Sequence, residues 1–323
     1  MTSRKEFAGA AAFVLGAALW PLAAGAQTAA PAWKPDRPVT IVVPYGPGGG
    51  SDSASRAVAN YLGKAWNQTV TVENLAGADG LIGTRRVMEA RPDGLTLLAQ
   101  QNGLLLTRFT PGFKGVDPMS RLEPVVQMSE SANTLVVKKS IAAQTFPELF
   151  KHCGQAKCSF GTASNAGRLQ GMLVQSSVPS LVIVGYKGSG AMLNDIMAGT
   201  VDMGLLGGSL VAAQHKAGAV RVLATLGDKR PPSLPDVPTA KEAGLPELYS
   251  VSWYGMFAPK GTPPEVVSAI AEAVTAAMGD PAVIAAIKTA GAETIGGTPA
   301  QFRKKLEEET ARVEPLVARF KFE

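Results

Sequence analysis

The sequence predicts an α/β protein in which helices cover a mainly parallel sheet. Strand-like runs and helix-like segments alternate along most of the chain, and this alternation is typical of parallel sheets. The chain has 323 residues, which is more than the length over which a single hydrophobic core keeps growing, so two lobes are expected.

Each element is marked by the period at which apolar residues recur. The expected strands are 39–43, 70–73, 95–99, 134–137, 159–162, 181–184, 201–205 and 220–225. The expected helices are 53–66, 84–90, 146–152, 169–176, 191–198 and 212–217. In the C-terminal part, capping boxes at 262–265 and 298–301 begin two helices, a third begins at Asp280-Pro281, and the last is interrupted near Pro315.

The N-terminus has the pattern of a secretory signal peptide, so residues 1–26 are expected to be removed on export. Arg4 and Lys5 precede an almost wholly apolar run, and Ala24-Gly25-Ala26 forms a small-x-small cleavage site before Gln27. An N-terminal membrane anchor is the alternative interpretation, but the apolar run is short against the ~20 residues that a span needs.

The charge and the cysteine content restrict which ligands the protein can bind and whether it holds a disulfide or a metal. The net charge of +5 is spread thinly, with few aromatic residues among the basic ones, so a small anionic ligand is compatible and nucleic-acid binding is not expected. Cys153 and Cys158 are the only cysteines, and in an exported chain they are expected to form one disulfide. A metal site that adds His152 is the alternative, but no fourth ligand accompanies these three residues.

The most informative motif runs from Ile41 to Asp52, where an apolar strand ends in a glycine-rich loop that leads into a helix. Backbone N–H groups and the positive end of the helix dipole meet there, so the loop can hold an anion without a cationic side chain. Three consecutive glycines remove the Cβ atoms that would keep a ligand from the backbone. Asp52 fits a helix N-cap better than a catalytic acid. The candidate ligand-binding residues are Tyr45, Gly46, Pro47, Gly48, Gly49, Gly50, Ser51 and Asp52.

Two further strand ends offer similar groups. Strand 159–162 leads into a small polar loop and a helix, with candidate residues Thr162, Ser164, Asn165, Ala166, Gly167 and Arg168. Strand 181–184 is followed by a phenol, an ammonium group and a glycine, at Tyr186, Lys187 and Gly188. Ligands of open α/β sheets bind outside the carboxyl ends of strands, so two such loops on two lobes would clamp a carboxylate from both sides. Each loop alone is also compatible with an ordinary strand-to-helix turn.

Enzyme templates fit this sequence poorly. Residues 46–51 approximate the dinucleotide-binding fingerprint, but Pro47 is inserted and Ser51 replaces the third glycine. The phosphate-binding loop lacks its Gly-Lys-Ser/Thr, and neither a Gly-x-Ser-x-Gly elbow nor a His-Glu-x-x-His pair occurs. No catalytic residue, metal or cofactor is therefore expected.

The chain resembles the substrate-binding proteins of tripartite tricarboxylate transporters, the Bug (Bordetella uptake gene) family. The resemblance covers about residues 33–319 and is carried by 42–52, 72–74 with 77–83, 91–98, 186–189, 235–239 and 242–246. It implies the type II periplasmic binding protein fold, with two α/β lobes, a ligand cleft and a two-strand hinge. Residues 27–130 with 252–323 would form lobe 1, and residues 131–251 would form lobe 2.

The same resemblance implies a periplasmic solute-binding protein without enzymatic activity. It would capture a small carboxylate with backbone groups of the 46–52 and 162–168 loops and deliver it to the large and small membrane subunits of a transporter. We expect a monomer. Three alternatives stay open: a ligand sensor for a membrane two-component signalling system, an exported enzyme on the same scaffold, and recognition of an aromatic acid by Trp253 or Tyr254.

The second loop departs from the family pattern. The family usually has Ser/Thr-Gly-Asn-Gly-Ser followed by His-Leu, whereas this chain has Ser164-Asn165-Ala166-Gly167-Arg168-Leu169-Gln170. Leu206-Gly207-Gly208-Ser209 stands where a turn rich in Asp and Asn is common. The resemblance implies that such positions shape the distal part of the pocket, so the sequence does not identify the carboxylate. We hypothesise that Arg168 pairs with a second anionic group of the ligand.

Overall fold

Two long strands organise the fold, β4 (Leu122–Lys138) and β9 (Val251–Pro259), which pair with each other in antiparallel fashion. The computed structural model describes residues 33–48, 50–109, 113–186, 188–289 and 291–320. Its strands follow the order β2-β1-β3-β9-β4-β7-β5-β6, and β8 and β10 pair with β4 outside this path. The expected signal peptide, residues 1–26, lies outside the described residues.

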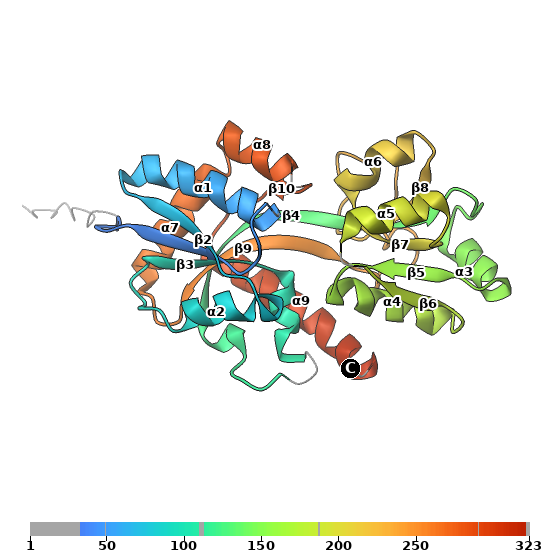
Figure 1. The fold of residues 1–323 in the computed structure, drawn as a ribbon, viewed down its shortest axis with the longest axis horizontal. Coiled ribbons are helices and arrows are strands. Elements are labelled where there is room, and N and C mark those ends of the chain that lie inside the picture. The colour runs from blue at the N-terminus through green and yellow to red at the C-terminus, as the bar shows by residue number, and fades with distance from the viewer. Residues whose placement is uncertain (1–32, 49, 110–112, 187, 290, 321–323) are drawn as a thin grey trace, which may run out of the picture. The chain divides into compact units, whose positions relative to one another are not determined.

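The first half-sheet contains residues 122–132 of β4 together with β9. Its other strands are β1 (Val39–Val43), β2 (Val70–Asn74), β3 (Thr96–Gln101) and β10 (Glu293–Thr294). The associated α-helices are α1 (Gly50–Trp66), α2 (Leu81–Met88), α7 (Pro264–Ala277), α8 (Pro281–Thr289) and α9 (Pro299–Phe320). β1 runs parallel to β2 and β3, and Figure 1 shows α1 and α8 on one side of this half and α2 on the other.

The second half-sheet begins with residues 133–138 of β4, which pair with β7 and β8. Its other strands are β5 (Ser159–Thr162), β6 (Val182–Gly185), β7 (Met203–Gly207) and β8 (Val220–Thr225). The associated helices are α3 (Phe146–Gln155), α4 (Asn165–Ser177), α5 (Ser189–Ala198) and α6 (Gly208–Lys216). β5 runs parallel to both β6 and β7, so its carboxyl end leads directly to α4.

Each half-sheet has its own hydrophobic core. In the first half, Leu62 of α1, Ile270 of α7 and Ile41 of β1 belong to one buried cluster. In the second half, Leu149 of α3 and Phe160 of β5 belong to one buried cluster. The expected disulfide joins Cys153 to Cys158, and both cysteines are buried in that same cluster.

The polypeptide passes between the two half-sheets next to Asn133. The Asn133 N–H donates to Ser250 O at 2.9 Å, and its carbonyl accepts from Leu226 N–H at 2.7 Å. Its carboxamide donates to Ser250 Oγ at 2.9 Å and to Ser252 Oγ at 3.3 Å. Three backbone segments are therefore tied together at one residue, which suits the hinge that the family resemblance implies. The lobe boundaries at 130/131 and 251/252 stay predictions.

Some local expectations are wrong in the structure. α9 continues through Pro315, where the exposed helix face allows water to satisfy the carbonyl that proline leaves without a donor. The expected capping box at 262–265 is absent, because Pro263 is the N-cap of α7 and the Thr262 hydroxyl donates to Pro259 O. The capping box at 298–301 is confirmed by hydrogen bonds in both directions between Thr298 and Gln301.

Within the described residues, no single helix is both long enough and apolar enough to cross a membrane. Only α7 and α8 together reach that length and composition, and the chain bends by 81° between them. Both helices bury apolar side chains in the first core, including Ile270 and Ile287.

Candidate functional site

The β1–α1 loop leaves its glycines open toward solvent. Gly46, Pro47 and Gly48 are exposed, and a Cβ atom added to Gly46 or Gly48 would meet no atom within 4 Å. Gly48 has φ +84°, a left-handed conformation that glycine adopts without strain. Gly49 lies outside the described residues. The loop therefore presents backbone rather than side chains, as the sequence predicts.

The Asp52 carboxylate holds this loop from within. Asp52 is buried and accepts hydrogen bonds from Gly48 N–H at 2.9 Å, Arg56 Nε at 3.1 Å and Asn74 Nδ2 at 2.9 Å. Asn74 Nδ2 also donates to Tyr45 O at 3.1 Å. Burial would raise the pKa of the Asp52 carboxyl, but the hydrogen bonds from Arg56, Gly48 and Asn74 lower this pKa below its usual value.

The expectation that Asp52 is an N-cap is wrong, because α1 begins at Gly50 and places Asp52 in its first turn. An acidic side chain there is favourable to the helix dipole, and this one is also committed to the loop. First-turn N–H groups have no partner inside an α-helix. In the described part of the chain, no acceptor outside the helix takes the N–H groups of Ser51 and Asp52.

Tyr45 is fixed by a chain of side-chain hydrogen bonds. Its hydroxyl donates to Gln100 Oε1 at 2.7 Å, and Gln100 Nε2 donates to Thr84 Oγ1 at 3.0 Å. A Cβ atom at Gly80 would lie 3.1 Å from the Tyr45 hydroxyl oxygen, so this close approach favours glycine. Sequence reasoning missed Gln100, because a glutamine that ends an apolar strand gives no signal by itself.

The β5–α4 turn is a second helix N-terminus at a strand end. Ser164 is the N-cap of α4, and its Oγ accepts the Gly167 N–H at 3.0 Å. The Thr162 hydroxyl donates to Ser164 O at 2.9 Å, and a Cβ atom at Gly167 would lie 2.5 Å from Thr162 Oγ1. Glycine therefore lets α4 begin directly beside β5. Arg168 lies in the first turn and is exposed.

At the third strand end, the Tyr186 side chain interacts within its own half-sheet. Its hydroxyl donates to Asp195 Oδ2 at 2.7 Å, and burial together with this hydrogen bond and the Asp195 charge raises the pKa of Tyr186 to about 12. The Tyr186 N–H donates to Thr162 O at 2.8 Å, which ties the ends of β5 and β6 together. Gly188 is the N-cap of α5, and Lys187 lies outside the described residues.

Other chemistry considered from the sequence finds no support in the described residues. No group of three or more His, Cys, Asp and Glu side chains there could hold a metal ion. Trp253 is fully buried and packs edge-on against Phe302, so it belongs to the core and does not face a ligand. Tyr254 is half-buried.

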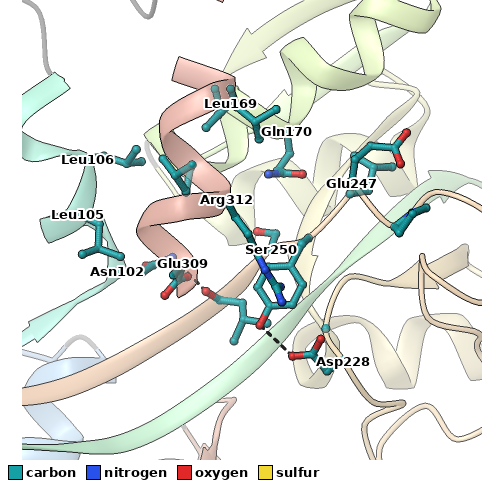
Figure 2. Close-up of a pocket in the computed structure, with 18 of the residues that line it drawn as sticks. Asn102, Leu105, Leu106, Leu169, Gln170, Asp228, Glu247, Ser250, Glu309 and Arg312 are labelled. Carbon is teal, nitrogen blue, oxygen red and sulfur yellow. Dashed lines mark hydrogen bonds between the residues drawn. The ribbon is translucent and has the colours of Figure 1, made fainter. Parts of the chain in front are cut away.

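A cavity of about 390 Å³ lies next to α9 (Figure 2). Its walls come from the 3₁₀ segment Asn102–Phe109, from α4, from α9 and from residues 246–251. Among the candidate residues that the structure describes, Ala166 is the one that lines it. Sequence reasoning missed this cavity, since its walls are separated by more than 200 positions along the chain.

Comparison with known proteins identifies the kind of receptor. The family model described as "Tripartite tricarboxylate transporter family receptor" matches residues 54–321. A UPF0065 protein from the tcbD-tcbE intergenic region of Pseudomonas sp. strain P51 is 33% identical over 89% of this chain and 87% of its own length. Protein BugT of Bordetella pertussis strain Tohama I is 30% identical over 86% of this chain and 87% of its own length. The structure of R. palustris Rpa4515 with adipate is 30% identical in sequence and has a TM-score of 0.72. The match covers 88% of this chain and 97% of Rpa4515.

The fold is thus that of the periplasmic binding proteins, built from two α/β half-sheets with helix N-termini at strand ends. The chain belongs to the tripartite tricarboxylate transporter receptor family, which includes the Bug proteins. Members of this family are solute-binding receptors and not enzymes. The resemblance and the fold class read from the sequence are both confirmed.

Proposed function

We propose that this receptor captures a small carboxylate between the β1–α1 loop and the β5–α4 turn and delivers it to the large and small membrane subunits of a tripartite transporter. One observation carries the proposal: in each half-sheet, a helix begins at the carboxyl end of a parallel strand, and its first turn has N–H groups without an acceptor among the described residues. α1 follows β1 in this way, and α4 follows β5. The adipate bound to Rpa4515 supports a carboxylate as the ligand.

The physical basis is the partial positive charge at a helix N-terminus. Each terminus offers unpartnered N–H groups and about half an elementary charge, which together hold an anion. Ser51 and Asp52 supply such groups in α1, and Ala166 supplies one in α4. A ligand that contacts both termini binds the closed form better than the open form, and this difference in affinity is what closes a two-lobed receptor.

A panel of ligands tests the function. We expect monocarboxylates, dicarboxylates or tricarboxylates to raise the melting temperature, because a ligand that binds only the folded state stabilises it. Uncharged methyl esters of the same acids, whose heads cannot donate a hydrogen bond, are the matched controls and should leave the melting temperature unchanged. If no carboxylate shifts the melting temperature or gives a heat of binding in calorimetry, the proposed function is wrong.

The Arg168→Ala variant tests how a second anionic group is recognised. We expect the affinity for dicarboxylates to fall roughly tenfold or more, since a hydrogen bond to a charged group contributes about 1.5–3 kcal/mol. The affinity for the corresponding monocarboxylates should change little. Lys151, which is exposed on α3, provides a control as Lys151→Ala. Equal losses for both classes of acid would exclude the role of Arg168 as partner of a second carboxylate.

A further inference from the structure

The cavity beside α9 has the properties of a small-molecule site. Its volume of about 390 Å³ falls in the range of roughly 300–1,000 Å³ that is usual for such sites. Apolar side chains line much of it, including Leu316 and the two leucines Leu105 and Leu169 that are labelled in Figure 2. An apolar lining with a few polar groups is the common composition of ligand pockets.

One buried polar side chain in the wall has no partner. Gln170 of α4 is 5% exposed, and its Oε1 atom is buried without a hydrogen bond. Within the described part of the chain its carboxamide nitrogen has no acceptor either. Figure 2 shows the carboxamide directed from α4 into the space beside Ser250 and Arg312. Buried amides in native proteins are nearly always satisfied, so this one points to a missing partner.

The charged groups of the cavity do not provide an anion site. Asp228, Glu247 and Glu309 supply three acids, against Lys241 and Arg312 as bases. The Arg312 guanidinium lies 4.0 Å from the centre of the Tyr249 ring, and the Tyr249 hydroxyl donates to Asp228 Oδ2 at 3.2 Å. Asp228 and Glu247 already balance the two bases, Glu309 is partly ionised with a pKa of about 7, and Arg312 stacks on an aromatic ring, so a carboxylate is disfavoured here.

We propose that this cavity is a second binding site, which takes an uncharged molecule with an apolar body and a head that both donates and accepts hydrogen bonds, as a primary amide does. The head pairs with the Gln170 carboxamide, whose oxygen accepts and whose nitrogen donates. The apolar body lies against Leu105, Leu169 and Leu316. This site adjoins the proposed carboxylate site at Ala166 and differs from it in its largely apolar lining and in the charge that it accepts.

Benzamide is the probe. Its binding is detected as saturable shifts of backbone amide resonances in ¹H–¹⁵N spectra of the isotope-labelled protein. We expect the amides of Leu169, Gln170 and Ser250 to shift together, with those of Ser51 and Asp52 unmoved. Benzoate has the same ring and an anionic head, and it should not displace benzamide from the cavity.

The Gln170→Leu variant isolates the amide pairing. It should weaken benzamide binding roughly tenfold, the effect expected from losing about two hydrogen bonds. Gln155→Leu changes an exposed glutamine and should leave binding unchanged. The proposal is overturned if wild-type protein shows no saturable shifts, if Gln170→Leu binds as well as wild type, or if benzoate competes for the same amides. Failure of carboxylates to bind would contradict the proposed function alone, because benzamide binding is read from different amides.

Discussion

Asp52→Ala is expected to reduce both the stability of the fold and the affinity for a carboxylate ligand. The substitution removes the acceptor that Gly48, Arg56 and Asn74 share, so the β1–α1 loop loses its attachment to the first turn of α1. Removing one partner of a buried ion pair costs about 3–5 kcal/mol. Half of the Arg56 side chain is exposed and can be rehydrated, so we expect a smaller loss, about 2–3 kcal/mol.

The effect of Asp52→Ala on binding follows from the position of Gly48. With the loop detached, the N–H groups at the start of α1 are no longer preorganised, and we expect affinity to fall at least tenfold. Urea unfolding and calorimetric titration measure the two effects. Asp36→Ala is the matched control, because Asp36 is exposed and, among the described residues, pairs with its neighbour Arg37 alone. Unchanged stability and affinity in Asp52→Ala would show that the network does not hold the loop.

The contribution of Asp52 to the stability of the folded state also depends on pH in a defined direction. The pKa of its carboxyl is lowered in the folded state from an ordinary value of 3.8, so the unfolded chain takes up the proton first as the pH falls. The stabilisation is therefore present above pH 3.8 and is lost as the pH falls below that value toward the folded-state pKa. The stability difference between wild type and Asp52→Ala should shrink over the same interval.

The second large effect is expected from Glu309→Gln on α9. Glu309 is buried and accepts a hydrogen bond from Trp253 Nε1. Burial raises the pKa of its carboxyl from 4.5 to about 7, although the Trp253 hydrogen bond and the charges of Lys305 and Arg312 oppose the rise, and Glu130 adds to it. Between these two pH values the folded protein binds more protons than the unfolded chain, so wild-type stability falls as the pH rises.

A neutral glutamine keeps the acceptor for Trp253 and removes this dependence on pH. At pH 8 we expect Glu309→Gln to be more stable than wild type by roughly 2–3 kcal/mol, with the difference disappearing near pH 4.5. Urea unfolding across this range measures it, and Glu307→Gln, on the exposed face of the same helix, is the control. A stability difference that does not vary with pH would mean that Glu309 titrates normally.

The sequence predicted the parallel βα units well because their signals are local. The apolar pattern of a strand, the small residues of the turn after it and the N-cap of the next helix lie within a few positions of one another. β5, Ser164 and α4 are an example. Strands 39–43, 159–162 and 220–225 have the same bounds in the structure as in the sequence prediction. Helices α1, α2 and α4 begin a few residues earlier than predicted, since glycine and asparagine in their first turns weaken the periodic signal.

Strand 134–137 was predicted, but the rest of β4 (Leu122–Lys138) and all of β9 were missed for physical reasons. Pro124 argues against a strand, but the register of β4 shifts between Pro124 and Val126, and this irregularity accommodates the proline. Gly255 lies in the middle of β9 and suggests a break. In the structure this glycine makes room for Phe302 of α9, because a Cβ atom there would lie 2.2 Å from the Phe302 ring. That requirement comes from a residue 47 positions away and is invisible locally.

The candidate site was predictable to the same local extent. The glycine-rich loop before α1 and the small polar loop before α4 could be recognised as leading into helix N-termini, whereas the partners of their side chains could not. Asp52 accepts hydrogen bonds from Arg56 and Asn74 of its own half-sheet. Tyr186 likewise donates a hydrogen bond to Asp195 of its own half-sheet. Glu309 and Gln170 resemble ordinary polar residues of a helix surface until α9 and α4 are placed against the rest of the protein.

The central claim is that helix N-termini from both half-sheets grip one carboxylate, and a single titration tests it. A carboxylate selected from the ligand panel is added to ¹⁵N-labelled protein, and the backbone amide resonances of Ser51, Asp52 and Ala166 are followed. We predict that the three amide resonances shift with the same dissociation constant and that the two lobes close on the ligand. Saturable shifts confined to one of the two termini, or binding that leaves all three amides unmoved, would contradict the account.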